Sequence, residues 1–317
     1  MKKLDLERIL GERMSELNLH PEGDYIVRAL GVNSEVRMTA IRSTETVTAA
    51  SEAHDLSPIA AVALGRFMSG LQLISQDLKN PGDLLSGSIK SDGPIKGITA
   101  VANEDGTVKG YVDNPLVESV FYNDKKFNLA AAIGNGSLSI TRKQAGAKPY
   151  TGSVPLISGE IAEDLTYYLY QSEQLPTILA LGVLCDENGI KHAGGFMVQA
   201  LPGAKPETID YLEQRIAGFP EISYLMEEGF DPAEILNLFI GADIEYLSVK
   251  ESKFYCDCSK DRMYNALLTL GAEDLLELSE DESGIELVCE FCNKVYNFTQ
   301  DELKAIYSIR KEALEGN

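Results

Sequence analysis

The sequence lacks any stretch approaching the roughly 18 consecutive apolar residues that a membrane-spanning helix requires, and we expect no membrane association. It is also poor in basic residues, with 28 Lys and Arg against 49 Asp and Glu and a formal net charge of −21. From Glu251 onward the balance is 7 basic to 15 acidic residues. Because such a surface repels a polyphosphate backbone, we expect no nucleic acid partner.

The N-terminus lacks the apolar core of a secretion signal. Its two lysines are followed by Asp5, Glu7 and Arg8 at the positions where that core would lie. We therefore expect the protein in the cytoplasm, where thiols are kept reduced. In that compartment, paired cysteines indicate metal or redox chemistry more often than a disulfide framework.

Cysteines are few, but four of the five lie in the last quarter of the chain, as a CxC pair and a CxxC pair. Residues i and i+2 of an extended segment point to the same side, and a CxxC turn brings its two thiols together in a similar way. Four thiolates complete a tetrahedral zinc shell, so we predict one Zn²⁺ per chain. The expected ligands are Cys256, Cys258, Cys289 and Cys292. A metal-free redox motif and unconnected core cysteines are the alternatives.

Other candidate ligands and catalytic groups are scarce. The three histidines, His20, His54 and His192, lie far upstream, and Cys185 is predicted to be a small buried residue at a strand end. An all-cysteine shell leaves no open position for water, which indicates a structural site. Since no nucleophile has a plausible base and no phosphate-binding loop is evident, we expect no enzyme activity.

The sequence disfavours two further classes of protein. A thiol-disulfide oxidoreductase would place its CxxC at the start of a helix, whereas the residues after Cys292 are predicted to form a strand. A zinc-ribbon adaptor or nucleic-acid binder is disfavoured by the acidic C-terminal segment.

The chain divides into three predicted segments. Residues 1–203 mix strand and helix signals in an α+β pattern with an extensive, largely antiparallel sheet and a long helix that begins at Ser57 and Pro58. Residues 204–250 contain three short helices, and residues 251–317 contain the paired cysteines.

The three short helices are predicted over residues 206–218, 221–229 and 231–241, each ending at a glycine. Helices shorter than about 12 to 15 residues are marginal in isolation, so these helices need a surface to pack against. Their apolar residues recur at near-helical spacing. The segment is interpreted either as an ordinary helical linker or as an apolar surface that becomes exposed under some conditions.

Several longer motifs accompany the cysteine pairs: "LSPIAAVALGR", "SDGPIKG", "GYVDNP", "GNGSLSITR", "YYLYQSEQLPT" and "AGGFMVQALPGA". In this order, and over nearly the whole chain, they resemble the redox-regulated 33 kDa heat-shock chaperones of bacteria. The resemblance implies an N-terminal substrate-interaction domain, a helical linker and a C-terminal zinc-binding redox switch. Cys185 lies outside the family's motif, and the chain is somewhat longer than the family would suggest.

The resemblance also implies an ATP-independent holdase, largely inactive when reduced and zinc-bound, that binds unfolding client proteins after oxidants expel the zinc. It implies disulfides between Cys256 and Cys258 and between Cys289 and Cys292, and a monomer that becomes a homodimer on oxidation. Local disulfides would remove the long-range connection between the two pairs. The expected client-binding residues are apolar residues of the short helices: Ile209, Leu212, Ile216, Phe219, Leu225, Met226, Leu236 and Phe239.

Overall fold

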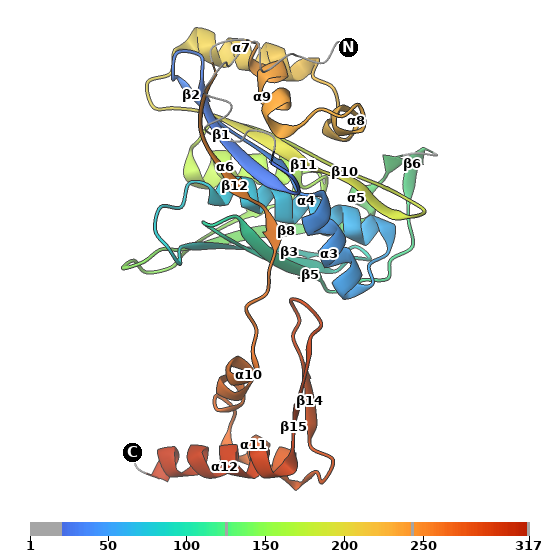
Figure 1. Ribbon diagram of the computed structural model, residues 1–317, viewed down its shortest axis with the longest axis vertical. Helices are drawn as coiled ribbons and strands as arrows, with labels where there is room; N and C mark the ends of the chain where they lie inside the picture. The colour runs from blue at the N-terminus through green and yellow to red at the C-terminus, as the bar shows by residue number, and fades with distance from the viewer. Residues whose placement is uncertain (1–20, 124–125, 242–243, 316–317) are drawn as a thin grey trace. The chain divides into compact units, whose positions relative to one another are not determined.

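A computed structural model of the chain describes residues 21–123, 126–241 and 244–315 and separates into two compact units, Met1–Tyr255 and Cys256–Asn317. The first unit has four layers, in which helices and sheets alternate (Figure 1). The α+β class is confirmed, with its antiparallel strands divided between two large sheets. Residues 1–20, which include Asp5, Glu7, Arg8 and His20, lie outside the described residues.

The first sheet contains five antiparallel strands in the order β10-β11-β2-β1-β12. Their bounds are β1 Tyr25–Gly31, β2 Val36–Arg42, β10 Thr177–Asp186, β11 Gly189–Ala200 and β12 Glu245–Glu251. Both faces of β11 are buried from Ala193 to Ala200, because helices cover the sheet on both sides. Strand β12 comes from the end of the segment with the short helices and pairs with β1.

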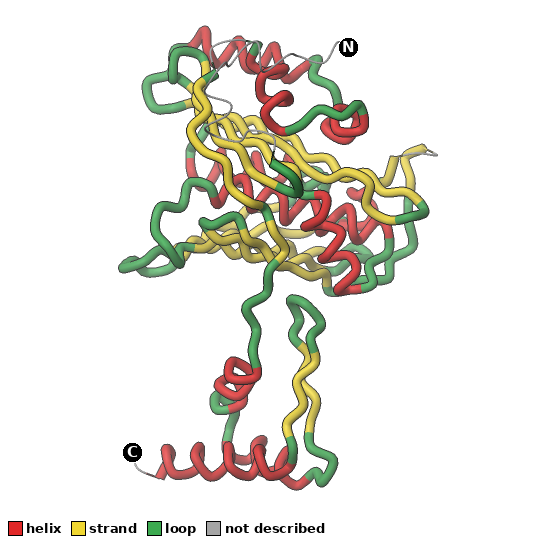
Figure 2. The backbone as a smooth tube through the Cα atoms, viewed as in Figure 1, coloured by secondary structure: helices red, strands yellow, loops and turns green. Residues whose placement is uncertain are grey.

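The second sheet contains six strands in the order β13-β5-β4-β3-β8-β9, antiparallel except where β13 joins β5. It forms the lower of the two yellow layers of the first unit in Figure 2. The bounds of its strands are β3 Leu84–Ser91, β4 Gly97–Asn103, β5 Thr107–Val112, β8 Gly136–Lys143, β9 Tyr150–Pro155 and β13 Lys253–Phe254. A small separate hairpin joins β6 (Phe121–Asn123) and β7 (Lys126–Phe127).

Helix α4 (Pro58–Ser75) lies between the two sheets and begins at the predicted residue, with Pro58 in its first turn. All its residues except Pro58 and Arg66 are buried. By length and composition it could cross a membrane, but 89% of it is buried inside the protein, as in the core helix of a globular unit. The same layer holds α3 (Thr44–His54), α5 (Leu129–Ile133) and α6 (Ala162–Glu173).

The three short helices are confirmed as α7 (Pro206–Ala217), α8 (Ile222–Glu227) and α9 (Pro232–Ile240), and they cover the outer face of the first sheet (Figure 1). Helix α9 starts with reciprocal hydrogen bonds between Asp231 and Glu234 and ends at Gly241, whose φ of 82° suits glycine. Residues 204–250 therefore belong to the first compact unit. The division into three domains stays a prediction.

The expected client-binding residues lie in the core between these helices and the sheet. Leu212, Leu225, Met226, Leu236 and Phe239 are buried, and the other three are partly buried. The ring of Phe239 packs 4.8 Å from that of Phe196 on β11. The sheet thus supplies the covering surface that such short helices need.

Glu35 fastens the first of these helices to the sheet. Its Oε2 accepts hydrogen bonds from Thr208 Oγ1 at 2.5 Å and from Lys205 N at 3.1 Å. The hydrogen bond from Thr208, followed by those from Lys205, lowers the pKa of Glu35 to about 2. A carboxylate with a lowered folded-state pKa stabilises the fold above its ordinary pKa of 4.5 and loses this effect as the pH falls toward 2.

We therefore expect Glu35→Gln to speed hydrogen exchange of the α7 amides at pH 7. The difference from the native protein should persist down to about pH 5 and disappear as the pH approaches 2. Glu207→Gln, which removes an exposed carboxylate from the same helix, is the control. Equal exchange in native and Glu35→Gln protein at pH 7 would contradict this role.

The chain passes from the first sheet to the second at Ser252, between β12 and β13. The Ser252 hydroxyl is 3.1 Å from Thr46 Oγ1 and accepts a hydrogen bond from Gln72 Nε2 at 2.9 Å, all in buried surroundings. Gly106 lies so close that a Cβ there would come within 2.2 Å of the Glu251 carbonyl oxygen. A buried polar network therefore holds the crossing at Ser252. The close approach of the Glu251 backbone leaves no room for a residue larger than glycine at position 106.

The second unit is small and has its own core. It contains α10 (Lys260–Leu267), α11 (Ala272–Glu280), the hairpin β14 (Ile285–Val288) to β15 (Val295–Phe298), and α12 (Gln300–Glu315). The buried residues of its hydrophobic core are Leu267, Leu275, Cys289, Tyr296, Phe298, Leu303 and Ile306. A core of this size provides limited stability by itself.

Candidate metal centre

Two separate segments deliver the four paired cysteines to one place. Cys256 and Cys258 lie in the extended stretch before α10, where the Ser259 hydroxyl accepts a hydrogen bond from Arg262 N and begins that helix. Cys289 and Cys292 lie in the turn of the β14–β15 hairpin. The turn is closed by hydrogen bonds from Cys292 N and Asn293 N to the Cys289 carbonyl oxygen.

The four sulfur atoms lie within 4.8 Å of one another, and all are free thiols. Cys256 Sγ is 3.7 Å from Cys289 Sγ, and Cys258 Sγ is 3.4 Å from Cys292 Sγ. A tetrahedral zinc site with Zn–S distances of about 2.3 Å has S···S edges of about 3.8 Å. The spacing and the all-sulfur donor set therefore fit a four-coordinate zinc ion, and these four cysteines could hold a metal ion.

Tyr296 on β15 contacts the cysteine cluster, which sequence reasoning did not predict. Its hydroxyl donates a hydrogen bond to Cys258 Sγ at 3.1 Å. Partial burial opposes ionisation of Cys258, but hydrogen bonds from Tyr296 and Cys292 outweigh it and lower the pKa of Cys258 to about 7. Burial raises the pKa values of Cys256 and Cys292. Cys258 thus carries negative charge more readily than Cys256 or Cys292.

Ion pairs support the segments that carry the cysteines. Arg262 lies 2.6 Å from Asp257, which separates the two cysteines of the CxC pair, and Lys260 lies 2.6 Å from Glu302 on α12. Cys289 itself is buried, with 6% of its surface exposed, in the core of the second unit. The hairpin turn and the CxC stretch are thus joined through the same small core.

The family of this chain follows from a match to the model for the Hsp33 protein over residues 24–299. The chain belongs to the Hsp33 family. It is 43% identical over 285 residues to the 33 kDa chaperonin of Ruminiclostridium cellulolyticum, covering 90% of this chain and 98% of that relative. It is 41% identical to the 33 kDa chaperonin of Clostridioides difficile, covering 89% and 98%. The resemblance stated from the motifs is confirmed.

A solved Hsp33 structure shares the fold. The crystal structure of the 33 kDa chaperonin from Thermotoga maritima matches with a TM-score of 0.83 and 36% identity, covering 91% of this chain and 99% of that one. At this level of identity and coverage, the likeness extends to the family as well as the fold.

The remaining cysteine and the described histidines of this Hsp33 chain lie in the first unit, outside the cysteine cluster. In the described part of the chain, the paired cysteines form the only group spaced to hold a metal ion. Cys185 lies near the end of β10, as predicted, but it is only partly buried; burial raises its thiol pKa to about 11. His54 is buried, and His192 Nε2 lies 2.9 Å from a Glu227 carboxylate oxygen.

The position of the CxxC pair argues against oxidoreductase chemistry. Cys289 and Cys292 lie in a turn between two strands, and the residues after them form β15 as predicted. A thioredoxin-like CxxC begins a helix, whose N-terminus lowers the pKa of the attacking thiol. Cys289 and Cys292 lack a following helix, so the geometry of this pair favours a metal-binding turn.

Proposed function

We propose that this Hsp33 chain is a redox-regulated, ATP-independent holdase that binds unfolding client proteins in the cytoplasm. The observation that carries the proposal is the convergence of four reduced cysteines, from segments about thirty residues apart, within 4.8 Å of one another. The relatives are named chaperonins, which supports the client-binding part. The proposal that oxidation controls client binding is supported by the clustering of the four cysteine thiols.

In the reduced state, Cys256, Cys258, Cys289 and Cys292 would hold one Zn²⁺. When bound, the ion would cross-link the two cysteine pairs and leave no open coordination position for catalysis. In zinc-finger peptides, structural zinc has an apparent binding free energy of roughly 10 to 16 kcal/mol. The 62 residues from Cys256 to Asn317 have a core too small to be stable by much on their own. The thiolates therefore decide whether this unit stays folded.

Oxidation of the thiols would break this connection. Each pair of zinc-binding thiolates would give two electrons to a peroxide, whose O–O bond breaks; with two protons from solvent the peroxide becomes two water molecules, and one S–S bond forms. A disulfide within CxC or CxxC closes a loop of 3 or 4 residues, which stabilises by about 2 kcal/mol at most. Neither disulfide would join the CxC stretch to the hairpin.

Loss of order in the second unit would then release the short helices α7 to α9, which precede it in the chain. Five of the eight expected client-binding residues are carried by these helices and are buried between them and the sheet. Their exposure would create an apolar surface for clients and for a second copy of the chain, which accounts for the proposed change from monomer to homodimer. Residues 1–203, 204–250 and 251–317 would act as substrate domain, linker and switch.

The pairing of the disulfides tests the release step directly. In the structure, the two shortest sulfur contacts described above run between the pairs, from Cys256 to Cys289 and from Cys258 to Cys292. We nevertheless expect peptide mapping of the peroxide-treated protein to find Cys256–Cys258 and Cys289–Cys292. Disulfides across the pairs would keep the two segments connected and would contradict activation by release. Metal content and light scattering on the same sample test the chaperone activity.

A further inference from the structure

Tyr296 lies on β15, shortly after the CxxC turn, and belongs to the core of the second unit. Successive side chains of a strand point to opposite faces. Tyr296 and Phe298 are accordingly buried, whereas Val295 and Asn297 are exposed. The antiparallel register places Tyr296 opposite Leu287 of β14. The hairpin thus fixes the face toward which the tyrosine side chain points.

The buried face of β15 meets the CxC stretch at two points. The Tyr296 hydroxyl donates its hydrogen bond to Cys258 Sγ at 3.1 Å. Two residues further along each segment, Lys260 Nζ lies 5.0 Å from the centre of the Phe298 ring. Residues 258 and 260 therefore meet residues 296 and 298 in the same order. The position of the hydroxyl beside Cys258 follows from the packing of the strand against this stretch.

A hydrogen bond to a thiolate changes the reactivity of its sulfur toward oxidants. In the proposed zinc-loaded state all four paired cysteines would be thiolates, because a metal ion binds the deprotonated form. The thiolate sulfur is the nucleophile in oxidation. A hydroxyl that donates to this sulfur stabilises its negative charge, and this stabilisation is lost as the sulfur gives up an electron pair. The barrier to oxidation of Cys258 is therefore higher with the Tyr296 hydroxyl than without it.

We propose that Tyr296 is a positioning residue of the redox switch, whose hydroxyl slows the oxidation of Cys258 and so raises the amount of oxidant that activation requires. The proposal rests on the zinc site and the redox control of the proposed function. It adds a side chain outside the metal shell that sets the threshold of the switch.

The oxidation step that Tyr296 slows begins at the Cys258 sulfur. This sulfur gives an electron pair to one oxygen of hydrogen peroxide, the O–O bond breaks, and a sulfenic acid forms. The hydroxide that leaves takes a proton from solvent and becomes water. The Cys256 thiolate then displaces a second hydroxide from the sulfenic sulfur, which forms the S–S bond, and a second solvent proton converts this hydroxide to water.

Tyr296→Phe tests the role of the hydroxyl, because it removes that group and keeps the buried ring in the core. The reduced, zinc-loaded full chain is treated with a limiting amount of hydrogen peroxide, and peptide mapping follows both disulfides at early times. The ratio of Cys256–Cys258 to Cys289–Cys292 should rise about threefold to tenfold over that of the native protein. The ratio is the decisive quantity, since general loosening of the unit would speed both disulfides.

Tyr307→Phe is the matched control. Tyr307 lies on α12, partly buried against the same core, and its hydroxyl makes none of the described hydrogen bonds to the cysteines. This variant should keep the native ratio. An equal increase of both disulfides in Tyr296→Phe would show only a loosened unit, and a lower ratio would show that the hydroxyl protonates the leaving hydroxide. Either result, or an unchanged ratio, would overturn the proposal.

Cobalt reports the hydrogen bond without any oxidant. The probe is Co²⁺ in place of zinc in the reduced full chain, where thiolate-to-metal charge-transfer absorption depends on how tightly the sulfur lone pairs are held. Tyr296→Phe should move this absorption to longer wavelength, because Cys258 then holds its lone pair less tightly. Tyr307→Phe should leave it unchanged. Equal spectra of native and Tyr296→Phe protein would show that the hydroxyl does not act on the bound thiolate, against the proposal.

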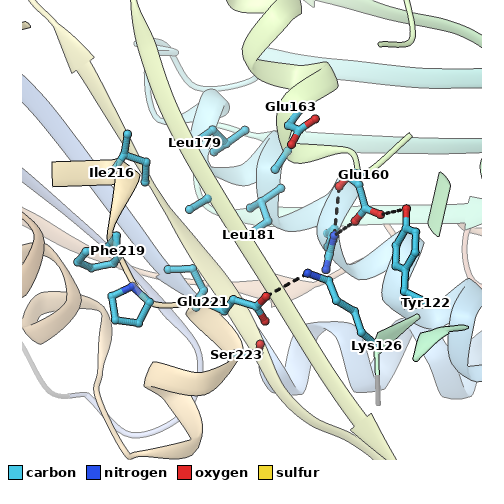
Figure 3. A pocket seen from close by; sticks show the side chains of 15 residues that line it. Tyr122, Lys126, Glu160, Glu163, Leu179, Leu181, Ile216, Phe219, Glu221 and Ser223 are labelled. Atoms are coloured by element: carbon cyan, nitrogen blue, oxygen red, sulfur yellow. Dashed lines mark hydrogen bonds and ion pairs between the residues drawn. The ribbon is translucent and has the colours of Figure 1, made fainter. Parts of the chain in front are cut away.

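Detachment of the short helices is a separate readout in the first unit. Glu221 precedes α8, and its carboxylate lies 3.0 Å from Lys126 Nζ of β7, beside a cavity of about 570 Å³ (Figure 3). This exposed ion pair is too weak to hold α8 by itself, so amide exchange over residues 222–227 reports when the helix leaves the sheet. In Tyr296→Phe, this exchange should increase at a lower peroxide dose than in the native protein.

The results separate this inference from the proposed function. A higher disulfide ratio in Tyr296→Phe without any change in α8 would support the role of Tyr296 and contradict the release of the short helices. An unchanged ratio together with native α8 release would contradict the role of Tyr296 alone. A reduced native protein that binds no zinc would contradict both.

Discussion

Peroxide treatment at elevated temperature is expected to release one zinc ion per chain from the reduced protein and, in the same sample, to suppress aggregation of an unfolding test protein. The reason is the difference between roughly 10 to 16 kcal/mol of metal binding and about 2 kcal/mol from each local disulfide. The second unit has a small core and is therefore expected to unfold when the two local disulfides replace the metal ion. Zinc is followed with a chromogenic chelator and aggregation by light scattering.

The controls for this experiment separate chaperoning from redox control. The thiol-protected protein should retain its zinc and leave scattering almost unchanged, and a thiol reductant with zinc should reverse the activation. Equal suppression by reduced and oxidised protein would preserve the holdase but contradict the switch. A purified reduced protein that contains no metal, yet has a folded second unit, would contradict the zinc assignment itself.

Replacing Cys289 with serine is expected to unfold the second unit without any oxidant. Cys289 is the most buried of the four paired cysteines, and its backbone closes the hairpin turn. Cys289→Ser removes one thiolate from the proposed metal shell, and breaking such a shell forfeits most of the folding energy that metal binding provides. Metal content should fall below one zinc per chain, and limited proteolysis should cleave within residues 256–315.

Cys185→Ser is the matched control, because Cys185 is the one cysteine outside the cluster. It lies in β10 of the first unit, and burial keeps its thiol protonated. This variant should retain zinc and the native cleavage pattern. If both variants keep their zinc, or if Cys289→Ser leaves the second unit resistant to protease, the four-cysteine shell is wrong. Greater cleavage in residues 204–250 of Cys289→Ser would further support coupling to the short helices.

The parts of the fold that the sequence predicted depend on local signals. Proline and glycine positions defined α7 to α9, because those residues set backbone conformation wherever they occur. The spacing of CxC and CxxC likewise indicated a shared ligand site, since thiol direction follows from local geometry. These elements needed no knowledge of distant contacts.

Features that depend on distant contacts could not be predicted. Helix α3 is rich in threonine and carries Val47, which favour strands, but it is helical because one face packs into the core against α4 and β11. The division of the strands into two sheets arises from pairings such as that of β12 with β1. The role of Tyr296 follows only from the folded hairpin, which brings its hydroxyl to Cys258.

The crossing at Ser252 also determines how many sheet edges depend on one short peptide. Strand β12 is the edge strand of the first sheet and β13 is the edge strand of the second. Ser252 alone joins them, and only Tyr255 separates the end of β13 from Cys256. Detachment of this peptide would uncover β1 and β5 at the same moment, exposing fresh backbone donors and acceptors in both sheets. The buried hydroxyl and amide groups around Ser252 therefore set the resistance that unfolding of the second unit would have to overcome before it reached β12 and the short helices.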